Sequence, residues 1–181
     1  SGEGIQALIE LREQGVVRAV GAGMNFASPL AELIRRADID LVMVAGRFTL
    51  LDHDAHAELL PLALERGVGV VVAGVYNSGL LGRDRPAADA HYDYQPAPAE
   101  MLQRANRIAD ACEEHGVTLP VAALAWALRH PAVVSVVVGA RGAEQLEQNV
   151  ARYETPVPEE LWAHLQSEGL LPATLDTGSP R

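Results

Sequence analysis

An arginine at a predicted strand-to-helix junction is the residue best placed for chemistry. Arg141 follows the apolar run 133–138 and a glycine, and it precedes an amphipathic segment that begins near Ala143. Free backbone N–H groups at a helix start attract anions, as does the positive end of the helix dipole. A guanidinium can add two hydrogen bonds to a phosphate. The junction predicts a phosphate site, and a plain loop with a solvated arginine is the alternative.

Amides lie next to this junction and at the ends of other apolar runs. Gln145, Gln148 and Asn149 follow Arg141 on the expected helix and could meet an adenine edge or a ribose. Glycines and polar residues also follow three earlier apolar runs, at 23–25, 46–47 and 76–79. Asn25 as a helix cap and 78–79 as a simple turn are the structural alternatives.

The elements that must position these residues follow from hydrophobic periodicity and from turn signals. The patterns predict helices at 4–14, 28–36, 54–65, 98–115, 120–129, from 143 onward and at 159–167, and strands at 16–22, 39–45, 69–73 and 133–138. Ser28 is the expected cap of the second helix, and Gly67 the stop of the third. A polar, proline-rich excursion fills 83–98, and 171–181 is expected to be a loose tail.

Composition limits the class of protein. The 181 residues are 49% hydrophobic, enough for one domain with a sizeable core. The longest apolar run, around 68–75, is far shorter than the roughly 18 residues of a membrane span, and we expect neither a membrane segment nor a signal peptide. A net charge of −10 argues against nucleic acid, and a single cysteine, Cys112, suits the cytoplasm. All basic residues are arginine, so no catalytic lysine exists in this chain.

Apolar strands that alternate with amphipathic helices predict an α/β fold with a parallel sheet. An open doubly wound sheet and part of a (β/α)8 barrel both fit. The open sheet would place a G-x-G-x-x-G fingerprint after its first strand, but 21–26 supplies only G-x-G. Because the unusual residues follow the carboxyl ends of the strands, where barrel chemistry collects, the barrel is favoured.

Four stretches resemble the second half of an aldo-keto reductase. They span 15–25, 47–52, 77–81 and 138–149 in family order, and their form is most similar to the branch that contains L-fucose or D-threo-aldose 1-dehydrogenases and pyridoxal 4-dehydrogenases. The resemblance implies that residues 1–170 form strands five to eight of a (β/α)8 TIM barrel. It also implies NADP or NAD as cofactor, a choice that Arg141 leaves open.

The resemblance assigns cofactor contacts residue by residue. Asn25 matches the asparagine that holds the nicotinamide carboxamide. The loop of Asn77, Ser78, Gly79 and Leu80 matches the one that wraps the pyrophosphate. The adenosine phosphate falls to Gly139, Ala140 and Arg141, and the adenine end to Gln145, Gln148 and Asn149. Three positions depart from the family pattern, with Met24, Ala45 and Ala73 where serine, glutamine and an aromatic are common. Tyr76 could replace that aromatic beside nicotinamide and substrate, or be a half-buried core tyrosine with a solvated hydroxyl.

Family catalysis uses a tyrosine, a lysine, an aspartate and a histidine from the first half of the barrel, and nothing in this chain matches their motifs. The resemblance therefore implies an NAD(P)-dependent oxidoreductase that oxidises an aldose at C1 to the lactone, of which this chain carries the cofactor half and is inactive alone. A non-catalytic nucleotide-binding or interaction domain is the alternative. Either way, four strands leave open edges, which predicts self-association or pairing with the missing half.

Two acidic and histidine-containing clusters resemble metal sites, but we expect no metal. The cluster at 52–56 suits a capped, solvated first helical turn better than a ligand set. Asp89, His91 and Asp93 lie in the long excursion, which resembles the family's substrate lid. A Ser–His–Asp triad stays open, although no G-x-S-x-G motif is present.

Overall fold

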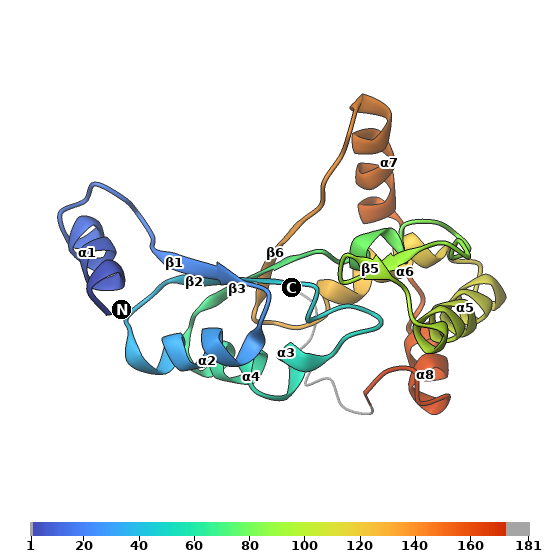
Figure 1. Ribbon diagram of the computed structural model, residues 1–181, viewed down its shortest axis with the longest axis horizontal. Coiled ribbons are helices and arrows are strands. Elements are labelled where there is room, and N and C mark those ends of the chain that lie inside the picture. Colours follow the sequence, from blue (N-terminus) through green and yellow to red (C-terminus); the bar gives the residue numbers. More distant parts are fainter. Residues whose placement is uncertain (1, 173–181) are drawn as a thin grey trace.

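The computed structural model describes residues 2–172, and Figure 1 shows their arrangement. The elements along the chain are α1 (Gly2–Glu13), β1 (Gly21–Met24), α2 (Ala27–Arg36), β2 (Leu41–Ala45), α3 (Asp54–Ala57), α4 (Leu59–Arg66), β3 (Gly69–Ala73), the short 3-10 helix η1 (Asn77–Gly79), β4 (His91–Tyr92), β5 (Gln95–Pro96), α5 (Ala99–Glu114), α6 (Leu119–Ala127), β6 (Val133–Val137), α7 (Ala143–Glu154) and α8 (Glu159–Ser167). No helix among these residues is long and apolar enough to cross a membrane.

The main sheet has four strands in the order β1-β2-β3-β6, all parallel. Leu41 of β2 pairs with Gly21 of β1 on one side and with Gly69 of β3 on the other. The prediction of a parallel sheet, with helices between successive strands, is therefore confirmed. Its strand order follows the sequence, as in one half of a (β/α)8 barrel.

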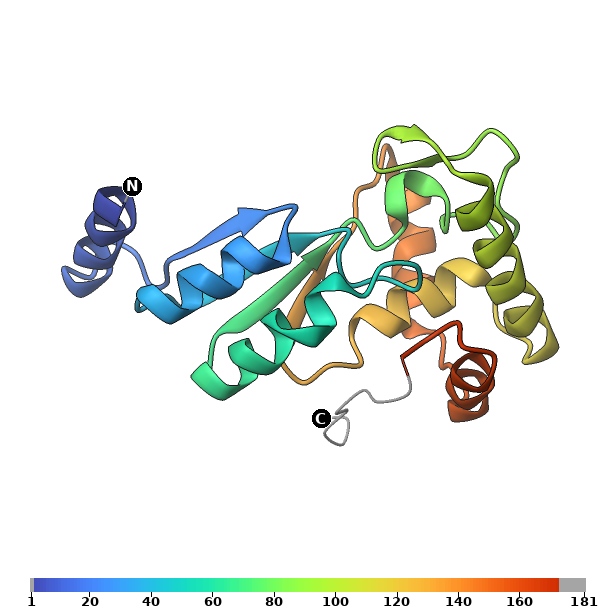
Figure 2. The same cartoon turned by 60° about the horizontal axis from the view of Figure 1, so that its bottom comes forward.

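Helices cover one face of this sheet. Val42 and Val44 of β2 are fully buried on the side where α2 and α4 pack, and both helices lie on the same side of the strands in Figures 1 and 2. Met43, which points to the opposite face, is 37% exposed. Parallel sheets normally bury both faces, so the second face is the part of the fold that lacks a cover within the described residues.

A second layer of the core lies where α5, α6 and α8 meet. Trp126 of α6 is fully buried, with its ring centroid 5.8 Å from that of Phe48 and 5.7 Å from that of Trp162. Cys112 of α5 is also fully buried, so the expectation that Cys112 and Trp126 are core residues is confirmed. This helical layer supports the loop that follows β2, through the contact of Phe48 with Trp126.

The first strand and the second helix begin at different residues from those expected. The strand starts at Gly21 rather than residue 16, because Val16 and Val17 belong to the turn that ends α1 and donate their N–H groups to the Leu11 carbonyl (2.9 and 3.4 Å). The helix starts at Ala27, with Phe26 as its N-cap, so the expectation of Ser28 as cap was wrong. Proline is tolerated in a first turn, which lets Pro29 lie inside the helix.

The expected helix over 54–65 is two helices, α3 and α4, with a break at Glu58. Pro61 explains the break, because a proline ring would clash with the carbonyl four residues earlier in a continuous helix. Gly67 ends α4 with a left-handed φ of 68°, as predicted.

The tail does not begin at residue 171. Leu171 is 4% exposed, and its N–H donates to the Leu165 carbonyl at 3.2 Å. Its apolar side chain packs with the core, so this part of the prediction of a loose tail was wrong. Residues 173–181, the rest of that predicted tail, lie outside the described residues.

Candidate functional site

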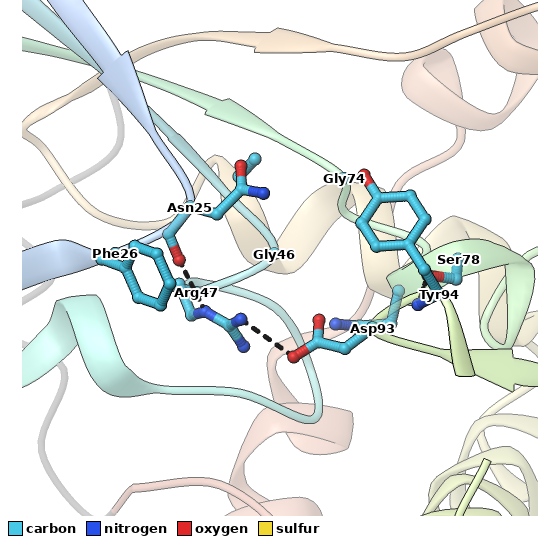
Figure 3. A pocket seen from close by; sticks show the side chains of 10 residues that line it. Asn25, Phe26, Gly46, Arg47, Gly74, Ser78, Asp93 and Tyr94 are labelled. Carbon is cyan, nitrogen blue, oxygen red and sulfur yellow. Dashed lines mark hydrogen bonds and ion pairs between the residues drawn. The ribbon is translucent and has the colours of Figure 1, made fainter. Parts of the chain in front are cut away.

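A cavity of about 230 Å³ opens where β1, β2 and β3 end (Figure 3). Its walls come from the three loops that follow these strands and from the hairpin of β4 and β5. The lining residues are Asn25, Phe26, Ala45, Gly46, Arg47, Gly74, Asn77, Ser78, Asp93 and Tyr94. Carboxyl ends of parallel strands are where barrel enzymes bind their ligands, and the structure brings three predicted contacts, Asn25, Asn77 and Ser78, together here.

Left-handed backbone conformations concentrate at this cavity. Asn77 (φ 43°), Ser78 (57°), Asp93 (48°) and Tyr94 (65°) are the non-glycine residues with positive φ among those the structure describes. All four line the cavity. Such conformations cost about 1–3 kcal/mol each and cluster at functional sites. The local backbone is therefore held in an unfavourable shape by its surroundings.

Asn77 carries an unsatisfied side chain. The residue is 3% exposed, yet neither its amide oxygen nor its amide nitrogen has a hydrogen-bond partner among residues 2–172. The large majority of buried side-chain polar atoms in proteins have a hydrogen-bond partner. An amide that lines a cavity without a partner is a group that a polar ligand can satisfy.

Arg47 joins three of the cavity walls. Its Nε donates to the Asn25 carbonyl (2.9 Å), Nη1 to the Asp52 carboxylate (2.8 Å) and Nη2 to the Asp93 carboxylate (2.8 Å). Partial burial lowers the pKa of Arg47, but the hydrogen bonds to Asp52 and Asp93 outweigh burial and raise the pKa above its ordinary value. The guanidinium therefore stays charged and keeps these walls in place.

Sequence reasoning missed the contributions of Arg47, Asp93 and Tyr94 to this cavity. The available signal for Arg47 was its place after an apolar strand, next to Gly46. For the hairpin the signal was the resemblance to a lid, and its tip does reach the cavity: the Tyr94 N–H donates to Ser78 Oγ at 3.2 Å. Exposed rings of Phe26 (64%) and Tyr94 (80%) lie on opposite sides of the opening in Figure 3.

Gly79, Leu80 and Tyr76 lie in the same loop but do not line the cavity. Leu80 is fully buried, and its N–H donates to the Asn77 carbonyl (3.1 Å), so it supports the turn from the core side. Tyr76 is half-buried, with the Arg152 guanidinium 5.7 Å from its ring centroid. This placement matches the alternative of a half-buried tyrosine, but the expected solvated hydroxyl is wrong, because the Tyr76 hydroxyl oxygen is buried without a hydrogen-bond partner among residues 2–172. Contact with nicotinamide or substrate stays a prediction.

The remaining predicted contacts form a second group at the end of β6. Gly139, Ala140 and Arg141 are exposed, and the Arg141 N–H donates to Gln145 Oε1 at 2.8 Å. Gln148 and Asn149 lie further along α7, a helix that stands away from the sheet in Figure 1. Asn149 Nδ2 donates to the Gly139 carbonyl at 3.4 Å. The structure thus separates the predicted site into two groups. We call Asn25 and the loop 77–80 the cavity group, and the loop 139–141 with Gln145, Gln148 and Asn149 the α7 group.

The acidic and histidine-containing segments have structural partners. Asp52 binds Arg47 and accepts the Asp54 N–H (3.0 Å), and no group of three or more His, Cys, Asp or Glu within residues 2–172 could hold a metal. Burial, and then the positive charge of Arg104, lowers the pKa of His53 to about 4.

Tyr92, in strand β4 of the hairpin, is a poor acid–base group. Tyr92 donates its hydroxyl to Asp52 Oδ2 at 3.3 Å. Burial, together with the negative charges of Asp52 and Asp93, raises the pKa of Tyr92 to about 12. A general base works best when its pKa lies near the operating pH, so Tyr92 is unsuited to remove a proton at neutral pH.

Comparison with known proteins agrees with the resemblance seen in the sequence. An Aldo/keto reductase family model matches residues 1–168. Pyridoxal 4-dehydrogenase of Microbacterium luteolum is 44% identical over 170 residues, which cover 94% of this chain and 49% of that protein. D-threo-aldose 1-dehydrogenase of Pseudomonas sp is 43% identical over 166 residues, covering 92% and 50%.

A solved structure shares the fold. The holo form of an aldo-keto reductase from Bacillus halodurans superimposes with a TM-score of 0.74 at 29% identity, over 94% of this chain and 56% of that chain. The predicted branch and the predicted part of a TIM barrel are both confirmed. This chain spans about half the length of the curated relatives that it matches.

Proposed function

Because this chain belongs to the aldo/keto reductase family, we propose that it is the cofactor-binding half of an oxidoreductase that uses NAD or NADP. The unsatisfied, buried amide of Asn77 in a cavity lined by left-handed backbone is the observation that carries the proposal. A dinucleotide offers the hydrogen-bonding groups that such an amide needs. Asn25 lines the same cavity, so one ligand there could contact both amides.

The cavity group and the α7 group would hold different parts of the dinucleotide. Asn25 would bind the carboxamide, and the loop 77–80 the pyrophosphate. The loop 139–141 and the amides of α7 would bind the adenosine end. Arg141 supports this division, because its side chain is exposed and makes no ion pair with residues of the described chain, which leaves the charge available to a phosphate.

We propose that the substrate of the whole protein is an aldose or a related aldehyde. The names of the two similar dehydrogenases support this class. Oxidation of an aldose to its lactone would remove the proton of the anomeric hydroxyl and a hydride from C1, and a bound nicotinamide would supply the hydride acceptor. This chain would bind and orient the cofactor for that transfer.

The acid–base residues would come from another part of the protein. This chain has no lysine, and the raised pKa of Tyr92 makes it a poor base. We therefore propose that residues 1–181 alone transfer no hydride. The same observation favours the second candidate, a nucleotide-binding or interaction domain without catalysis, if the protein has no other catalytic half.

The helices next to the two open edges of the sheet favour a missing half of the barrel over a second copy of this chain. In a closed barrel one helix fits between neighbouring strands. If two copies closed a barrel, α7 of one and α1 of the other would compete for the gap between β6 and β1, since α1 precedes β1 and α7 follows β6. A native polypeptide about twice this length would agree with the relatives. We also propose a cytoplasmic location, because the thiol of Cys112 is free and buried.

Titration with NAD and with NADP tests the proposal. The wild-type protein should bind at least one of them, and Arg141→Ala should weaken binding by about 10–100-fold, the value of one charge-assisted hydrogen-bonding contact. Arg36→Ala is the matched control, because Arg36 lies on α2 and pairs with Glu32 away from the cavity. A greater loss for NADP than for NAD would place Arg141 at the 2′-phosphate. Failure of the wild type to bind either coenzyme at millimolar concentration would refute the proposal.

A further inference from the structure

Arg152, in the last turn of α7, touches the loop that follows β3. Its guanidinium carbon lies 5.7 Å from the centroid of the Tyr76 ring, and its Nη2 lies 3.5 Å from the Gly82 carbonyl oxygen, a long hydrogen bond. Tyr76 and Gly82 lie at the two ends of a turn segment, 76–82, that two overlapping hydrogen bonds close: the Leu81 N–H donates to the Tyr76 carbonyl (3.1 Å), and the Gly82 N–H to the Gly79 carbonyl (3.0 Å). One side chain on α7 thus spans the whole turn that contains Asn77 and Ser78.

The same guanidinium orients an amide on α7. Nη1 of Arg152 donates to Asn149 Oδ1 at 3.2 Å, while Asn149 Nδ2 donates to the Gly139 carbonyl at 3.4 Å. A guanidinium can only donate, so the Asn149 oxygen must face it and the Asn149 nitrogen must face the loop after β6. Arg152 therefore sets the orientation of Asn149 as well as its distance from the turn.

Little else holds α7 in place. None of its residues is buried, and Leu146, Val150 and Tyr153 are 57%, 47% and 66% exposed. The helix packs against α6 and stands away from the sheet in Figure 1. Arg152, by contrast, is half-buried. The polar and cation–π contacts of this one residue are therefore a large share of what fixes α7 relative to the turn.

We infer that Arg152 is a positioning residue that holds the two halves of the cofactor site at the spacing a dinucleotide requires. The inference rests on the proposed cofactor function, which places the pyrophosphate at 77–80 and the adenosine end at 139–149. Arg152 itself touches neither predicted phosphate position. It acts by joining two binding surfaces, and joined surfaces bind a two-part ligand more tightly than either part alone.

Arg152→Met, which keeps length but removes the guanidinium, tests the inference with nucleotides of two sizes. The dissociation constant for the preferred coenzyme should rise about tenfold, equivalent to about 1.4 kcal/mol. The dissociation constant for nicotinamide mononucleotide should change by less than about twofold, because this ligand engages the cavity side only. The dissociation constant for AMP should rise less than that for the coenzyme, because Arg152 orients Asn149 but AMP does not span both surfaces. Arg152→Lys should lie between, since it keeps a cation over Tyr76 but loses the fork. Arg107→Met, a helix arginine that reaches Glu168, is the matched control and should behave as wild type.

Hydrogen exchange of the unliganded full-length protein supplies a readout that needs no nucleotide. Amides of 76–82 and of 143–154 should exchange faster in Arg152→Met, while those of β2 and β3 should not change. If the wild type binds no coenzyme, the cofactor proposal fails and exchange alone decides whether Arg152 couples the two segments. Unchanged exchange, or an equal loss of affinity for the coenzyme and for both mononucleotides, would overturn the inference.

Discussion

Replacing Arg47 by methionine should destabilise the protein more than the removal of any exposed ion pair would. The substitution removes three hydrogen bonds, to the Asn25 carbonyl and to the carboxylates of Asp52 and Asp93. It also leaves Asp52, whose side chain is only 14% exposed, without its cation. A methionine fills a similar space, so the loss reports mainly on charge and hydrogen bonding.

The size of the loss follows from how exposed each partner is. A charge-assisted hydrogen bond to a mostly buried group contributes about 1.5–3 kcal/mol, which applies to Asp52. Asp93 is 44% exposed, and a pair of that kind contributes less than about 1 kcal/mol. With about 1 kcal/mol for the bond to the Asn25 carbonyl, and because such terms are not fully additive, we expect a loss of about 2–4 kcal/mol in the free energy of unfolding.

Urea denaturation followed by far-UV circular dichroism measures this loss at pH 7. Arg36→Met is the control: Arg36 is 77% exposed, and its removal should change the free energy by less than about 0.5 kcal/mol. Asp93→Asn should cost less than Arg47→Met, because it leaves the Asp52 pair intact. A loss below about 0.5 kcal/mol for Arg47→Met would show that this guanidinium does not hold the cavity walls together, and the reasoning would be wrong.

Three further predictions concern a histidine, the cysteine and a pair of glycines. The pKa of His53 is lowered from an ordinary 6.5 to about 4, so as the pH falls the unfolded chain takes up a proton before the folded chain does. The free energy of unfolding should therefore be highest above pH 6.5 and fall by up to about 3 kcal/mol toward pH 4. His53→Gln should remove this part of the pH dependence in urea titrations. Burial raises the pKa of Cys112 to about 12, so its thiol should resist iodoacetamide at pH 8 in the native protein and react in urea; rapid native labelling would contradict its burial. Gly21→Ala would place a methyl 1.9 Å from the Leu41 carbonyl oxygen and should cost about 1–3 kcal/mol, whereas Gly4→Ala, with open space around it on α1, should stabilise slightly; thermal melts that rank them in the reverse order would refute the close approach of β1 to β2.

Much of the candidate site follows from the order of residues along strands and turns. Asn25, Asn77 and Ser78 each come just after an apolar strand, and parallel strands bring their carboxyl ends to one edge. The family motifs placed Arg141 and the α7 amides after the last strand, where the structure also has them. What the sequence could not supply was the distance between the cavity group and the α7 group, since that depends on how α7 packs.

From the order of residues alone came the parallel sheet, most of its strands and helices, and the family, whereas the hairpin of β4 and β5 and the break at Glu58 did not. Those properties depend on local periodicity and on short motifs, as the agreement over 69–73 and 159–167 illustrates. Three features needed the folded chain: Arg47 meets Asp93, forty-six residues later, Asn77 is buried with no side-chain hydrogen-bond partner among residues 2–172, and Leu171 joins the core. Contacts of this kind arise when the whole backbone folds, because the free energy of a charge or an amide is set by neighbours that are distant in sequence.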